Sequence, residues 1–238
     1  METFVDGIAW LFDSANWQGP NGVAVRLVEH VWLTVASVLI ACALAIPVGL
    51  WLGHIGKGGA LAINVSNVGR AVPVFAVLSI LILTPLRFSV WSTIIALVLF
   101  AIPPVLTNTY VGMREVDRDV VDVARGMGMD GGQLLRVVEL PLALPLLTNG
   151  VRLAAVQVVA TATIAALVGG GGLGRIITSG FGRRDLPQIV AGAILVGVLA
   201  LLVEGLMELV QRRFDPLRRA RRAESRAGSD AVAAVTGS

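Results

Sequence analysis

The chain has 238 residues, of which 55% are hydrophobic and only 15% are charged, and its mean hydropathy is +0.80. Soluble domains contain about 25% charged residues and fewer apolar ones, so the composition indicates a membrane protein. The net charge of +3 could suggest a nucleic-acid partner. However, the positive side chains gather in short segments beside apolar stretches, as in membrane proteins, and we expect no nucleic acid among the partners.

Residues 1–26 carry acidic side chains, at Glu2, Asp6 and Asp13, ahead of the first long apolar stretch. A cleaved signal peptide begins with a basic region and ends in a small-residue cleavage site, and this segment has neither. Residues 4–12 have the pattern of an amphipathic helix that lies in the membrane interface. We therefore interpret residues 1–26 as an extracytoplasmic or interfacial segment.

Five later stretches are long and apolar enough to cross a bilayer, which predicts an all-α, multi-pass protein surrounded by membrane lipid. Within a membrane domain of residues 27–214, they lie at about 28–52, 61–83, 90–110, 144–168 and 188–210. The second stretch is unusual, because its first half is polar and Pro73 separates it from an apolar second half. The basic tail, residues 215–238, has a composition typical of disordered segments.

The Lys and Arg residues outside the spans predict their orientation. One side collects twelve cations, which are Lys57, Arg114, Arg118, Arg125, Arg136 and the seven arginines from Arg212 onwards. The other side holds five, which are Arg26, Arg87, Arg175, Arg183 and Arg184. Since positive loops stay in the cytoplasm, we expect the N-terminus outside, the C-terminus inside, and the loop 113–141 in the cytoplasm.

This loop is too polar to cross a membrane and too regularly patterned for a simple linker. Residues 119–127 have helical spacing, and one face is apolar: Val120, Val123, Ala124 and Met127. Residues 130–138 form a second helical stretch, whose apolar members are Leu134, Leu135 and Val138.

The ends of the second stretch also carry signals. Asp130 and Gln133 have the spacing of a capping box, and we expect Leu140-Pro141 to end the helix before the fourth span. Gly128 between the two stretches allows a sharp turn and close backbone approach. The apolar stripe could insert into a groove on a partner protein, or the loop could fold back onto the membrane surface. The pattern alone leaves both alternatives open.

The spacing of the loop resembles a known signature. Asp122-Val123-Ala124 is followed after three residues by Gly128, after nine more by Val138, and then by Leu140-Pro141. This resembles the EAA signature of ABC importer permeases, which reads E-A-A, three residues, G, nine residues, I, one residue and L-P. Asp122, Val123 and Val138 depart from it conservatively.

In that family the loop docks into a cleft on the ATP-hydrolysing subunit, whose closure moves the permeases between inward-open and outward-open states. The resemblance implies ATPase-coupling roles for Asp122, Val123, Ala124, Gly128, Leu134, Leu135, Val138, Leu140 and Pro141. None of these residues would perform chemistry, so the chain is expected to be a non-catalytic subunit.

Further motifs narrow the resemblance to permeases of osmoprotectant importers, which take up glycine betaine, carnitine, choline or proline. These motifs are Glu29-His30 and residues 46–54, 69–78, 124–129, 139–145 and 169–174. The resemblance implies the five-span fold of type I importer permeases in the bacterial cell membrane. It also implies a second permease copy or paralogue, a dimer of ATPase subunits and an extracytoplasmic substrate-binding protein.

Three other functions fit the sequence less well than this resemblance. Permeases for methionine or another small amino acid share the five spans and the glycine cluster, and are the alternative within the class. An intramembrane enzyme would need a nucleophile and a base suitably placed, and the sequence contains no such pair. A secondary transporter would normally be longer and contain two internal halves.

Polar residues within the second and fourth spans, and the proline that breaks the second, are candidates for the pathway or its gate. They are Asn67, Arg70, Pro73, Asn149, Arg152, Gln157 and Thr161. A charge within a span costs about 2.5–3.5 kcal/mol on insertion scales, so such residues usually face a cavity or a partner. Alternatively, the arginines reach the interface and the amides and hydroxyls bond neighbouring helices.

Residues 169–174 formally fit G-x-G-x-x-G, but they follow a membrane span rather than a strand, so we interpret residues 169–187 as a flexible loop near a gate. The chain contains no P-loop sequence, so ATP is expected to bind a partner, and this chain is expected to bind no cofactor. Cys42 is the only cysteine, which excludes an internal disulfide. We expect neither His30 nor His54 to have a catalytic or metal-binding role.

Overall fold

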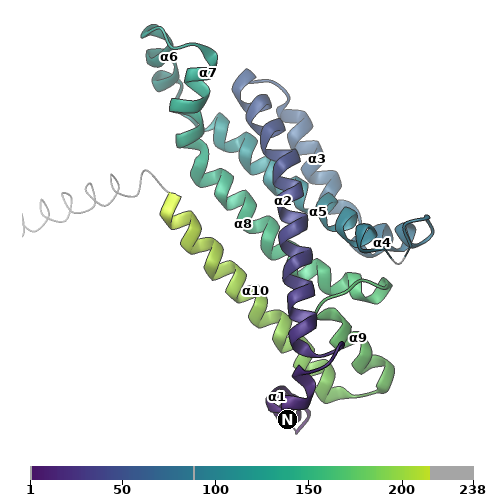
Figure 1. The fold of residues 1–238 in the computed structure, drawn as a ribbon. Helices are drawn as coiled ribbons and strands as arrows, with labels where there is room; N and C mark the ends of the chain where they lie inside the picture. The colour runs from purple at the N-terminus through teal and green to yellow at the C-terminus, as the bar shows by residue number, and fades with distance from the viewer. Residues whose placement is uncertain (1, 88, 215–238) are drawn as a thin grey trace, which may run out of the picture.

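The computed structural model describes residues 2–87 and 89–214, so predictions for the tail, residues 215–238, lie outside the described residues. The regular elements of the described chain are all helical (Figure 1). They are α1 (Glu2–Phe12), η1 (Ser14–Trp17), α2 (Val23–Ile55), α3 (Gly59–Ala71), α4 (Val74–Ile82), α5 (Val90–Arg114), α6 (Arg118–Gly126), α7 (Gly131–Gln133), the π turn η2 (Leu134–Glu139), α8 (Leu140–Ala165), η3 (Ala166–Val168), α9 (Gly174–Arg183) and α10 (Leu186–Phe214).

Four helices of the described chain are long and apolar enough to cross a membrane, rather than the five spans expected: Val23–Ile55, Val90–Arg114, Gly131–Val168 and Leu186–Arg213. The predicted second span is two short helices, α3 and α4, which are separated at the proline that was expected to break it. The break lies at Val72-Pro73, where Val72 is extended because a proline disfavours helical backbone in the residue before it. Neither short helix reaches the roughly 20 residues that a crossing requires.

Small residues allow α2 and α5 to pack closely. Every fourth residue of α2 in this region is small and buried: Ser37, Ala41, Ala45, Gly49 and Gly53. A Cβ atom added at Gly49 would lie 2.8 Å from Cβ of Thr109, and one at Gly53 would lie 2.3 Å from Cβ of Met113. Such spacing is the small-xxx-small pattern of membrane helix pairs. Since the contacts advance together along both helices, α2 and α5 run parallel.

The remaining long helices alternate in direction. Asn149 of α8 contacts Asn108 of α5, and Gln157 contacts the carbonyl of Phe100, so α8 runs antiparallel to α5. Arg152 of α8 contacts Glu204 of α10, and the carbonyl of Pro145 contacts Gln211, so α10 runs antiparallel to α8. The main apolar core lies among α2, α5 and α8.

The helix that contains α8 is longer than expected, because it runs without interruption from Gly131 to Val168. Leu140-Pro141 therefore do not end it, contrary to the prediction. The backbone widens into a π turn just before the proline, and the N–H of Leu140 donates to the carbonyl of Leu135, five residues back. A proline in a regular helix lacks a donor and clashes with the carbonyl four residues back, so a wider turn accommodates it.

The length of this helix separates the two ends of the molecule. Its 38 residues extend for about 57 Å at 1.5 Å per residue, whereas the apolar core of a bilayer is about 30 Å thick. The loop with α6 and α7 lies at one end, and α1 and α9 lie at the other (Figure 1). Helix α9 was not expected, because residues 169–187 were interpreted as a loop. Gly174 permits this helix, since a Cβ there would lie 2.4 Å from the carbonyl oxygen of Thr163.

Candidate functional site

The loop between α5 and α8 folds as a small unit with its own apolar core. Four of its side chains are buried against one another: Val116, Val121, Ala124 and Leu134. Met129, Val138 and Leu142 pack around them. A loop lying flat on a membrane would turn its apolar side chains to the lipid. This loop instead projects beyond the long helices (Figure 1) and buries part of its apolar surface internally.

Two aspartates cap the short helices of the loop. The Asp117 side chain accepts a hydrogen bond from the N–H of Asp119 at 2.9 Å and caps α6. Asp130 caps α7 by accepting from the N–H of Gln133 at 2.8 Å, while Gln133 Oε1 accepts from the N–H of Asp130 at 3.2 Å. The capping box predicted from the sequence is therefore confirmed, and it fixes where the second helix begins.

Gly128 joins the two halves of the loop with a φ of +88°, a conformation that residues with a Cβ rarely adopt. The structure corrects one part of the expectation. A Cβ at Gly128 would meet nothing within 4 Å in this chain, so the backbone turn, and not close internal packing, requires glycine here.

The expected apolar stripe divides into two faces. Val120, Val123 and Met127 are 44%, 63% and 69% exposed and form an outer face, which we call the α6 outer face. Ala124 points inward, contrary to its expected place in a contact surface. Leu134 was expected on the stripe that would grip a partner, but it is 1% exposed and belongs to the loop core.

The other residues assigned to coupling lie around these two faces. Asp122 is exposed beside Arg125, with 3.9 Å between the charged atoms. Leu135 and Val138 are half-buried in the π turn. Leu140, also half-buried, is the first residue of α8, and Pro141 is the second.

Among the described side chains, the polar residues of α8 proposed for a pathway bond a neighbouring helix or their own. The Asn149 amide donates to Asn108 Oδ1 at 3.3 Å, and Gln157 Nε2 donates to the carbonyl of Phe100 at 3.4 Å. Thr161 donates to the carbonyl of Gln157 within its own helix. These contacts correspond to the alternative in which polar groups bond a neighbouring helix or their own.

Two arginines, Arg70 and Arg152, lie within predicted spans. Arg152 forms an ion pair with Glu204 of α10, with 3.4 Å between Nε and Oε1, so it has a partner within the bundle. The side chain of Arg70 lies outside the described residues, although its backbone belongs to α3. Asn67 is exposed on α3, and Pro73 is the N-cap residue immediately before α4.

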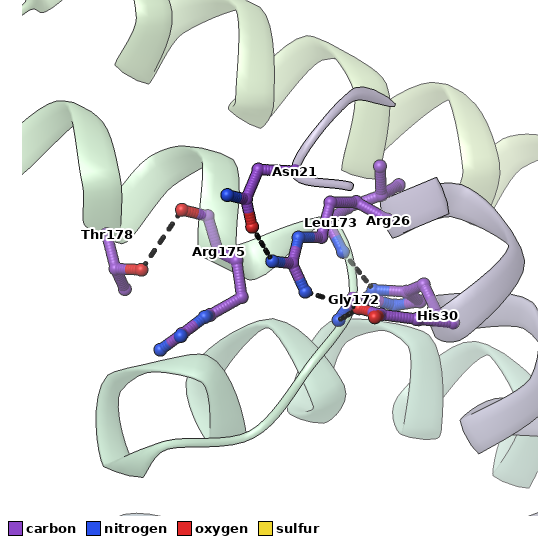
Figure 2. Close-up of polar contacts among 8 residues, drawn as sticks. Asn21, Arg26, His30, Gly172, Leu173, Arg175 and Thr178 are labelled. Carbon is purple, nitrogen blue, oxygen red and sulfur yellow. Dashed lines mark hydrogen bonds and ion pairs between the residues drawn. The ribbon is translucent and has the colours of Figure 1, made fainter. Parts of the chain in front are cut away.

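At the opposite end, Glu29 and His30 hold the glycine-rich segment, residues 169–174, against α2. Figure 2 shows His30 beside Gly172 and Leu173 of this segment. Glu29 Oε2 accepts hydrogen bonds from the N–H of Gly172 at 3.0 Å and from Arg26 at 2.7 Å. His30 Nδ1 accepts from the N–H of Leu173 at 3.2 Å.

His30 is fully buried, and its second ring nitrogen, Nε2, lies 3.0 Å from the carbonyl oxygen of Val159 in α8. Because Nδ1 accepts, Nε2 carries the proton and donates to this carbonyl. Gly172 has a φ of +84°, and a Cβ there would lie 2.9 Å from His30 Nδ1. The segment is thus clamped at this point, and not the freely flexible loop expected from its composition.

Sequence reasoning used Glu29-His30 only as part of a family resemblance and missed this role. An acidic residue and a histidine near the start of an apolar helix were a signal that polar partners exist elsewhere in the chain.

A polar pocket of about 510 Å³ opens beside this clamp, between the segment that follows α1 and helix α9. Three arginines line it: Arg26, Arg175 and Arg183. Asp185 is the acidic residue of its lining, and Arg26 is paired with Glu29. Arg175 and Arg183 therefore leave the lining with a small excess of positive charge.

A family model described as "Binding-protein-dependent transport system inner membrane component" matches residues 45–216. The carnitine transport permease protein OpuCB of Listeria monocytogenes is 36% identical over 196 residues, covering 82% of this chain and 89% of the relative. The glycine betaine/carnitine/choline transport system permease protein OpuCB of Bacillus subtilis (strain 168) is 31% identical over 188 residues, covering 79% and 86%.

A solved structure of an ABC transporter has a fold similar to that of this chain. An inward-facing conformation of the MetNI methionine ABC transporter superposes with a TM-score of 0.68 at 22% identity, covering 81% of this chain and 95% of that one.

Proposed function

The chain belongs to the family of binding-protein-dependent transport system inner membrane components, and on that premise we propose that it is the permease subunit of an ATP-driven importer of osmoprotectants. The proposed substrates are osmoprotectants such as glycine betaine, carnitine, choline or proline. The observation that carries this proposal is the 36% identity, over 82% of the chain, to a carnitine transport permease. The likeness to a methionine transporter, at 22% identity, supports the fold alone.

We propose five membrane crossings, with the α3–α4 pair as the second. The chain leaves α2 at the end that packs against Met113, near the last residue of α5. Because α2 and α5 run parallel, the connection between them must return to the opposite end, and α3 and α4 make this return. With α8 and α10 alternating in direction, the start of α2 and the end of α10 fall on opposite sides of the membrane.

The loop between α5 and α8 is proposed to lie in the cytoplasm and to couple the permease to a partner ATPase. The α6 outer face supports this, because exposed Val123 and Met127 form the apolar side of a short helix that can lie in a partner's groove. The loop core keeps that helix in a fixed orientation, so a push on it displaces the loop as a unit.

The opposite end is proposed to face a substrate-binding protein, because the pocket lined by Arg26, Arg175 and Arg183 suits an acidic surface. The translocation pore is proposed to require a second permease, identical or paralogous. Relatives named OpuCB and OpuCD occur in the same organisms and support such pairs. The pathway candidates would then act at the interface between the two permeases or between helices. They are Asn67, Arg70, Pro73, Asn149, Arg152, Gln157 and Thr161.

Transport can be tested with the permease, its ATPase and its binding protein reconstituted in proteoliposomes. We expect ATP-dependent uptake of labelled glycine betaine, carnitine or choline, and none of labelled methionine. Uptake of methionine alone would overturn the osmoprotectant assignment, and uptake that persists without ATP would overturn the class.

The role of the loop can be tested with two matched variants. Val123→Asp places a charge on the α6 outer face, and Val137→Asp places one at a similarly exposed valine on the adjoining π turn. We expect the ATPase to co-purify with the Val137 variant and to be lost from the Val123 variant. Equal co-purification in both would argue against docking through the α6 outer face.

A further inference from the structure

A buried carboxylate joins the loop to a helix that is distant in sequence. Glu139, the last residue of the π turn, is 1% exposed, and its Oε2 lies 2.5 Å from Nδ1 of His54. His54 belongs to the last turn of α2, 85 positions earlier in the chain. Burying a carboxylate costs free energy unless the carboxylate is paired and hydrogen-bonded, so the bond to His54 offsets the cost of burying Glu139.

His54 contacts both ends of the short segment that leads into α8. While Nδ1 bonds Glu139 at the end of the π turn, Nε2 lies 3.5 Å from where a Cβ on Gly131 would be, at the start of α7. The imidazole is therefore close to both ends of this segment, at residues 131 and 139.

The end of α2 is itself fixed to the end of α5. Gly53 packs against Met113, and Gly56 packs against the guanidinium of Arg114. A displacement that reaches His54 is therefore passed to α2 and α5 together.

The covalent connections of the loop lead only to α5 and α8. Helix α2 contributes to the same core as these two helices, but the chain links it to the loop only through α3, α4 and α5. Among the described residues, the His54–Glu139 contact is a side-chain hydrogen bond that bridges α2 and the loop region. It also sits at the π turn, and such turns frequently occur at functional sites.

We propose that the His54–Glu139 pair is a positioning contact that transmits displacement of the loop to α2, so that ATP hydrolysis by the partner moves α2 together with α5 and α8. This inference rests on the proposed function. It predicts that removing the contact uncouples hydrolysis from transport while the loop still binds the ATPase, because the α6 outer face is unchanged.

The reconstituted transporter tests this with three measurements: co-purification of the ATPase, the rate of ATP hydrolysis, and uptake of labelled glycine betaine. His54→Ala removes the donor, whereas His54→Asn keeps an amide donor close to the position of Nδ1. Glu208→Gln is the control, because it removes a carboxylate from an exposed ion pair with Arg212 on α10.

We expect His54→Ala to retain the ATPase and its hydrolysis, and to raise the ATP hydrolysed per betaine transported by about tenfold, within the range found for residues that carry coupling between sites. His54→Asn should restore most of the wild-type ratio, and Glu208→Gln should match the wild type. Glu139→Gln, which keeps the shape of the side chain, should give an intermediate ratio.

Two results would overturn the inference. An unchanged ratio in His54→Ala would mean that the pair carries no displacement. A loss of hydrolysis and uptake in equal proportion, with less ATPase bound, would mean that the pair only supports the folded loop. If the wild-type complex itself transports none of the osmoprotectants, the proposed function fails instead, which separates the two failures.

Discussion

Replacing His30 with alanine should release the glycine-rich segment from α2. The imidazole makes two buried hydrogen bonds, one from the N–H of Leu173 and one to the carbonyl of Val159, 3.2 and 3.0 Å long. The Val159 carbonyl still accepts a hydrogen bond from the Thr163 hydroxyl, so only the buried N–H of Leu173 is left without its partner, at a cost of about 1–3 kcal/mol. The cavity left by a fully buried ring adds to this loss.

Thr34→Ala is the matched control, because Thr34 is buried one turn further along α2 and its hydroxyl donates only to the carbonyl of His30 in the same helix. Its loss should cost about 1 kcal/mol. Thermal unfolding in detergent would rank the two variants, and hydrogen exchange would locate the effect. We expect the amides of residues 170–175 to exchange faster in His30→Ala and to be unchanged in Thr34→Ala. If the amides of residues 170–175 exchange at the same rate in both variants, His30 does not hold the segment.

Three further predictions concern packing and backbone conformation. Gly128→Ala should destabilise the loop by about 1–2 kcal/mol, because Gly128 has a positive φ. Gly126 is equally free of neighbours but helical, so Gly126→Ala should be neutral or stabilising. Limited proteolysis should therefore cleave the loop faster in the Gly128 variant only. Gly53→Ala should cost about 1–3 kcal/mol by forcing α2 away from α5, and an unchanged melting temperature would contradict the close packing. Arg152→Met should lower the melting temperature more than the double replacement of Arg152 and Glu204 by apolar residues, because the single change leaves the Glu204 carboxylate unpaired. If the double replacement lowers the melting temperature by the sum of the two single replacements, the pair is not coupled.

The sequence predicted the elements whose signals are local. Long apolar runs located the four spanning helices, since hydropathy over about 20 residues requires no knowledge of neighbours. The capping box at Asp130 was also found, because a cap depends on residues three positions apart. The spacing from Asp122 to Pro141 identified the loop as a distinct feature of the chain.

Contacts between distant segments were decided only by the tertiary structure. Local spacing cannot tell which side of a short helix turns inward, so Ala124 and Leu134 were assigned to a contact surface although they form the loop core. Glu29 and His30 acquire a role only because the fold brings residues 143 positions away against them.

The same reason applies to the two histidines, for which no catalytic or metal-binding role was expected. A single ionisable residue near the end of an apolar helix gives no sign of its partner, because the partner's position depends on how the helices pack. The sequence by itself determined that the chain crosses a membrane and carries a patterned loop. Only the tertiary structure decided that His54 meets Glu139, and that this loop is tied to α2 as well as to its own neighbours in the chain.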